Sequence, residues 1–141
     1  MKMQLDDARG LTTEQGSGLT IATNTAMNES VSVIGVMSNA GLVNWSSSED
    51  LADAGAASLA VMTSFFATGG AETSSLAAGI YPGQMKILSC AAHGGNMVTT
   101  VANPAWGGSG TITFTGAGSS CMLIFLNSLW HVVGSHAVTL A

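Results

Sequence analysis

Two apolar stretches separated by a two-residue turn decide the fold class: CMLIFL at residues 121–126, Asn127-Ser128, and LWHVV at residues 129–133. The first stretch is apolar on both faces of a strand. It must therefore be covered twice, by a second layer of its own subunit or by a neighbouring subunit. Asn127 tolerates the left-handed backbone that a two-residue hairpin needs. We predict a C-terminal β-hairpin and expect it to be the best-defined element of the fold.

The sequence before this hairpin alternates between short β-rich stretches and glycine-rich turns. In TITFT, residues 111–115, threonine alternates with apolar residues, which is typical of a strand with one buried face. The stretches follow one another at close to the spacing of about 8–12 residues found in all-β sandwiches and barrels, with no repeat of fixed period. The predicted strands are 59–66, 73–76, 84–91, 97–101, 111–115, 121–126, 130–134 and 137–140. We predict an all-β fold, with a β-sandwich or jelly-roll-like module over residues 55–141.

Residues 1–54 form a second, more polar region, which we interpret as an extended N-terminal arm. Seven of the eight acidic residues and two of the three basic residues precede residue 54. Within this region the β-branched residues of 19–23 and 30–37 predict strands. The sequence at 46–53 is typical of a capped, short helical turn.

Charged side chains are almost missing from the second half of the chain. Residues 73–141 contain one, Lys86, apart from three histidines, whereas soluble domains have about a quarter of their residues charged. Such a surface is more often covered by another protein than exposed to water. The pattern indicates a subunit whose stability and solubility come from assembly.

Composition excludes several kinds of partner. Three Lys and Arg residues cannot provide a basic nucleic-acid footprint, and a net charge of −5 gives no attraction to an anionic membrane surface. No apolar run reaches the roughly 18–20 residues that span a bilayer, and no secretory signal is visible. We expect folding in a cytoplasm, where Cys90 and Cys121, both within predicted strands, stay buried and reduced.

The sequence offers little catalytic or metal-binding chemistry. A metal site needs converging ligands, but no acidic residue follows Glu72, and His93, His131 and His136 are scattered over turns and a strand. A Ser-His-Asp arrangement lacks an acid near the later serines. We therefore expect no enzyme activity, no cofactor and no metal, although a trimer axis would bring three copies of one histidine together.

The order of five segments resembles a β module of virion structural proteins in tailed bacteriophages. The matching residues are 63–73 (TSFFATGGAET), 76–79 with 83–87, 94–98, 110–114, and 118–120 followed by the apolar strand and WHVVG at 130–134. Proteins of that kind are often capsid decoration (cement) proteins, head fibres or tail appendages, and many are trimeric. Residues 1–55 carry no such resemblance.

The resemblance implies a protein that works by assembly, and does not by itself say which virion component it is. We predict a capsid decoration protein that binds the outside of the major capsid shell as a homotrimer, assembled in the bacterial host cytoplasm. Residues 1–54 would then contact the capsid by strand addition and charge. The alternative is a tail fibre or appendage module that recognises surface glycans. A third class is a filament subunit that donates strands. The candidate contact residues for the capsid or for neighbouring subunits are Asp6, Asp7, Arg9, Glu14, Trp45, Trp106, Leu123 and Phe125.

The tryptophans are the largest anchors in a chain with few aromatic residues. We expect Trp130, in the closing strand, to belong to the core. For Trp106, in a glycine-rich turn, the sequence leaves two interpretations open. The ring is either exposed for a neighbouring subunit or glycan, or packed against its own sheet.

Overall fold

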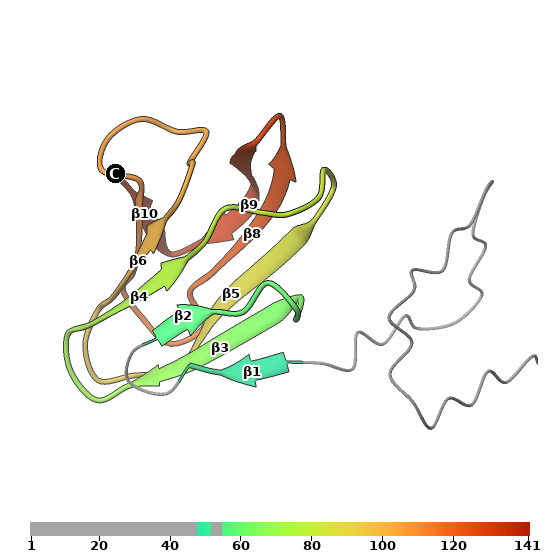
Figure 1. The fold of residues 1–141 in the computed structure, drawn as a ribbon. Helices are drawn as coiled ribbons and strands as arrows, with labels where there is room; N and C mark the ends of the chain where they lie inside the picture. The colour runs from blue at the N-terminus through green and yellow to red at the C-terminus, as the bar shows by residue number, and fades with distance from the viewer. Residues whose placement is uncertain (1–47, 52–54) are drawn as a thin grey trace, which may run out of the picture. The chain divides into compact units, whose positions relative to one another are not determined.

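The computed structural model describes residues 48–51 and 55–141, which belong to one compact unit. These residues form two five-stranded sheets and no helix (Figure 1), so the predicted all-β, two-layer fold is confirmed. The first sheet has the order β1 (Ser48–Asp50), β3 (Thr63–Thr68), β5 (Met85–His93), β8 (Ser120–Leu126) and β9 (Leu129–His136). The second has the order β10 (Val138–Leu140), β7 (Thr111–Phe114), β6 (Met97–Val101), β4 (Glu72–Leu76) and β2 (Gly55–Ala57).

The two sheets are connected as a stack of five β-arches, in which a strand of one sheet turns over into the facing strand of the other. The pairs are β1/β2, β3/β4, β5/β6, β8/β7 and β9/β10. The first three arches stack in parallel in both sheets, as in a parallel β-solenoid. The fourth runs antiparallel to the third. A jelly roll is wholly antiparallel, so this parallel half is a feature that the sequence did not predict.

The parallel stacking rests on a repeat that the sequence analysis missed. The pairs Gly69-Gly70 and Gly94-Gly95 lie 25 residues apart, and the register places Thr68 beside His93 and Glu72 beside Met97. A Cβ on Gly95 would lie 2.3 Å from the carbonyl carbon of Gly70. Because the two turns touch through their backbones, only glycine fits at this point.

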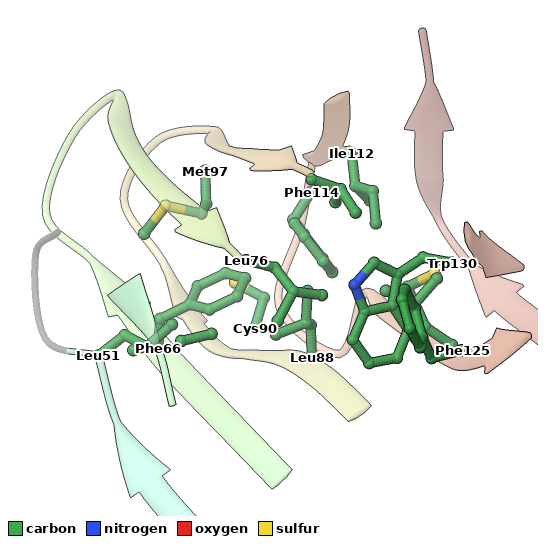
Figure 2. Close-up of a cluster of buried hydrophobic side chains, with 14 residues drawn as sticks. Leu51, Phe66, Leu76, Leu88, Cys90, Met97, Ile112, Phe114, Phe125 and Trp130 are labelled. Carbon is green, nitrogen blue, oxygen red and sulfur yellow. The ribbon is translucent and has the colours of Figure 1, made fainter. Parts of the chain in front are cut away.

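The core lies between the sheets and is centred on aromatic pairs (Figure 2). Phe66 and Phe114 meet edge to face at 4.9 Å between ring centroids, and Phe125 packs on Trp130 at 5.1 Å. Trp130 is fully buried, and its Nε1–H donates to the carbonyl of Ala77 at 2.9 Å. The expectation that Trp130 is a core residue is confirmed.

The predicted hairpin is also confirmed. β8 and β9 pair directly, and Asn127 and Ser128 both have positive φ, at 49° and 63°, as a type I′ turn requires. The eight predicted strands correspond to β3–β10, with β6 at its predicted bounds. The helical turn is wrong at residues 48–50, which form edge strand β1 because pairing with β3 outweighs the local capping pattern. The strands predicted at 19–23 and 30–37 lie outside the described residues.

The stack has two unlike ends, which we name by their connections. At the arch end, residues 69–71, 94–96, 115–119 and 137 join the two strands of one arch. At the open end lie the connections 58–62, 77–84, 102–110 and 127–128, which lead from one arch to the next (Figure 1).

Candidate assembly surface

The surface of residues 73–141 carries no charged side chain other than histidine. Lys86, the one Lys, Arg, Asp or Glu in this part of the sequence, is 1% exposed. The acidic residues in the described part of the chain are Glu49 and Asp50 on β1 and Glu72 at the start of β4. The charge depletion read from the sequence is therefore still more complete on the folded surface.

Large exposed apolar side chains are concentrated at the open end. Ile80 is 62% and Tyr81 70% exposed, the highest values for large apolar residues in the described part of the chain. Five of the six such residues lie at this end, the exception being Val133 on β9: the five are Ile80, Tyr81, Leu126, Leu129 and Leu140. The loop 77–84 lies beside the hairpin, because Gly83 N–H donates to the carbonyl of Phe125 at 2.8 Å.

A hollow of about 330 Å³ opens next to these residues. Its lining consists of Leu59, Ala60, Val61, Met62, Gly83, Gln84 and Met85. Gln84 is the one polar side chain among them, and both ends of its amide are already bonded. Its Nε2 donates to the Leu59 carbonyl at 2.9 Å, and its Oε1 accepts from Ile80 N–H at 2.8 Å. The hollow thus presents apolar surface and no free charge.

The wall of the hollow is held by a buried ion pair. Lys86 Nζ donates to the carbonyls of Ser58 at 2.8 Å and Val61 at 3.1 Å, and to Glu49 Oε1 at 3.2 Å. All three hydrogens of the ammonium group are therefore used. With Gln84 on Leu59, two side chains fix three carbonyls of the 58–61 segment, so the shape of the hollow is set before anything binds.

Both members of this pair have shifted pKa values. Burial lowers the pKa of Lys86, and its contact with Glu49 offsets only part of that effect. Burial opposes ionisation of Glu49, but hydrogen bonds from the Ser64 hydroxyl, Ser58 N–H and Lys86 outweigh it, so the Glu49 pKa is lowered. The pair joins β1 to β5.

The outward face of the first sheet continues the apolar surface. Along β8, Cys121, Leu123 and Phe125 point into the core, whereas Met122 and Ile124 point outward and are half-buried. Ile124 pairs with Met85 and Met122 with Ile87 across β5. Since Met85 also lines the hollow, the face and the hollow are continuous.

The structure separates the candidate contact residues named from the sequence. Leu123 and Phe125 lie in the core, and their neighbours Met122 and Ile124 face the surface of β8 instead. Trp106 is half-buried and packs against the core, the second of its two interpretations. Asp6, Asp7, Arg9, Glu14 and Trp45 lie outside the described residues. The predicted division at residue 54 crosses the module, because β1 is an edge strand of the first sheet.

Sequence reasoning missed Ile80 and Tyr81. The signal was the position of Tyr81, the single tyrosine of the chain, directly before Pro82-Gly83. Turns and loops run over the surface, so a large apolar residue before Pro82-Gly83 is expected to be exposed, and exposed apolar patches mark interaction sites.

Reactive side chains do not gather in the part of the chain that the structure describes. No group of three His, Cys, Asp or Glu side chains among these residues is arranged to hold a metal ion. His93 lies near Asn96 Oδ1, at 3.3 Å, in an exposed turn. Cys90 and Cys121 are buried free thiols, as predicted, and burial raises the Cys121 pKa to about 11.

Comparison with models of known protein families and with curated protein sequences finds no match to this chain. Among the described residues, no helix is long and apolar enough to cross a membrane.

Proposed function

We propose that this protein is a non-enzymatic structural subunit that works by assembly, as a capsid decoration protein of a tailed bacteriophage. One observation supports the assembly part above all. Residues 73–141 expose no charged side chain apart from histidines, while the open end exposes Ile80, Tyr81, Leu126 and Leu129. Contiguous exposed apolar surface marks sites of interaction. The virion part rests on the resemblance of residues 60–141 to phage structural modules.

In this proposal a homotrimer binds the outside of the major capsid shell. A ligand that binds the assembled shell and not its separated subunits stabilises the shell by mass action. The acidic N-terminal residues, among them Asp6, Asp7 and Glu14, would contact the capsid. The same surface argues against glycan recognition by a tail appendage, because the one polar side chain of the hollow is bonded internally and Trp106 packs on the core.

Copy number in the virion tests the proposal. Particles purified from the source culture are analysed by quantitative mass spectrometry and cryo-electron microscopy. Hundreds of copies on the shell exterior are expected for a decoration protein. A few tens of copies at the tail would favour the appendage alternative, and a protein that never sediments with particles would overturn the proposal.

A further inference from the structure

The geometry points to a specific contact between copies, in which Ile80 and Tyr81 of one subunit enter the hollow of a second subunit. This inference rests on the assembly part of the proposed function and names the contact by which the copies associate. Three observations carry it: the chemistry of the hollow, the exposure of the pair and the absence of charge between them.

The chemistry of the hollow selects an apolar occupant. Six of its seven lining residues have no polar side chain, and the amide of the seventh, Gln84, is already bonded at both ends. A charged group placed there would lose water and gain no charged partner, because no charged side chain lines the hollow. An apolar side chain of another polypeptide has no polar group to remove from water, so it does not incur this desolvation cost.

The hollow is also built in advance. The carbonyls of Ser58, Leu59 and Val61 are held by Lys86 and Gln84, so the wall does not have to be ordered when a partner arrives. Preorganisation of this kind lowers the entropic cost of binding.

The pair provides the matching occupant. Tyr81 is 70% and Ile80 62% exposed, so neither fills the hollow of its own subunit. Gly83 and Gln84 of the hollow follow the pair after one residue, Pro82, so pair and hollow are neighbours on one surface. When two complementary features lie side by side on one subunit, two copies can bind each other reciprocally about a two-fold axis. Alternatively, each copy can bind the next around a closed ring.

Charge does not oppose the approach of two copies. The connections 58–62 and 77–84 contain no charged residue, and Lys86 beneath them is buried. The carboxylate of Glu49, which accepts from Ser58 N–H, is paired with Lys86, so identical surfaces meet with little like-charge repulsion.

The experiment compares three variants of the full chain by analytical ultracentrifugation over a range of concentrations. Ile80→Ser with Tyr81→Ser removes the pair. Ala60→Arg places a long charged side chain at the exposed rim of the hollow. Val133→Ser, at a residue 57% exposed on β9, removes an equally exposed apolar residue away from the open end and serves as the matched control. Thermal melts verify that each variant is folded.

We expect the wild type and Val133→Ser to associate alike. The pair and hollow variants should each need at least about tenfold more protein for half-association, as loss of a central apolar contact predicts. Mixing these two variants should restore part of the association, because the pair of the Ala60→Arg copy still meets an intact hollow in the other copy.

Three results would overturn the inference. The first is a wild type that stays monomeric at about 10⁻⁴ M, where stable assembly would already be formed. The second is association unchanged in both variants, and the third is loss of association in the pair variant alone. Sedimentation with source particles, measured in parallel, separates the two proposals. A wild type that forms the oligomer but does not sediment with particles counts against the decoration function. A wild type that sediments with particles as a monomer counts against the contact between copies.

Discussion

At the arch end of the module, neighbouring turns of the chain pack against each other through backbone atoms. At the open end the chain instead exposes large apolar side chains. Gly94 and Gly95 pack against the turn at 68–71 so closely that a Cβ on either would lie under 3 Å from backbone atoms. Thr68 Oγ1 donates to the carbonyl of Gly95 at 2.5 Å and accepts from the N–H groups of both glycines. At the open end, Ile80 and Tyr81 extend from a loop anchored beneath by Trp130 and Gln84.

The difference shows how one stack separates stability from contact. The third arch must have small residues where its turn stacks on that of the second, since Gly94 and Gly95 contact the turn at 68–71 through backbone atoms. The open-end connections also require glycine at some positions, such as Gly79 beside the Phe125 ring. Ile80 and Tyr81, however, are exposed there and free to serve binding, as residues of loops on a rigid scaffold commonly are. Substitutions at the close-packed glycines and at buried anchors should therefore affect folding, whereas substitutions at the exposed Ile80 and Tyr81 should affect assembly.

The largest expected effect comes from Trp130, which anchors the open end from below. Trp130→Ala removes a fully buried ring and its hydrogen bond to Ala77, and should destabilise the fold by about 3–5 kcal/mol. Chemical denaturation measures this loss, and hydrogen exchange should show faster opening of 77–84 than of the arch end. A melting temperature unchanged within a degree or two would contradict the burial of Trp130.

Removal of the buried ammonium group should come next. Lys86→Met keeps the length of the side chain but leaves the Ser58 and Val61 carbonyls without their donor, at a cost of about 2–3 kcal/mol. The double variant that also carries Glu49→Gln should recover part of the loss, because it has no carboxylate left without a cationic partner. Equal stability of wild type and Lys86→Met would show that the pair contributes nothing net.

A single methyl group tests the arch end. Gly95→Ala places a Cβ 2.3 Å from Gly70 and should destabilise by about 1–3 kcal/mol through overpacking. Gly70→Ala is the matched control, because a Cβ there meets nothing within 4 Å. If both alanines behave alike, the close approach of the two turns is not what limits this position.

Acid should weaken the link between β1 and β5. Because the Glu49 pKa is lowered from 4.5, the folded state binds fewer protons than the unfolded chain. This contribution is present above about pH 4.5 and is lost as pH falls through the folded pKa. Denaturation followed from pH 7 to pH 3 should show a decline that is shallower in Glu49→Gln, and parallel curves would contradict the assignment to Glu49.

Deletion of residues 1–28 should have the smallest effect on folding. The described sheets contain none of these residues, so the module should keep its melting temperature, but it should no longer bind its particle if Asp6, Asp7, Arg9 and Glu14 make the capsid contact. Circular dichroism and sedimentation with empty shells measure the two effects. Full occupancy by the truncated protein would exclude the arm hypothesis, and failure to fold would place residues 1–28 in the β structure.

Local patterns in the sequence determined a definite part of this structure. The two-sided apolar run at 121–126, the Asn127-Ser128 turn and the alternation at 111–114 predicted their strands, because hairpin pairing is set by neighbouring residues. The burial of Trp130 and of both cysteines, and the missing charge after residue 72, could likewise be read directly from residue type and position.

Only the tertiary structure decided the remaining features, because they depend on residues far apart in the chain. The parallel arches set Gly69-Gly70 beside Gly94-Gly95, 25 residues away. Lys86 meets Glu49 across 37 residues, and the hollow forms where 59–62 meets 83–85. No local pattern encodes such contacts, since a strand's propensity is the same whether it pairs in parallel or antiparallel. The order of strands in the sheets buries Lys86 where it binds Glu49, Ser58 and Val61. The same order leaves Ile80 and Tyr81 exposed.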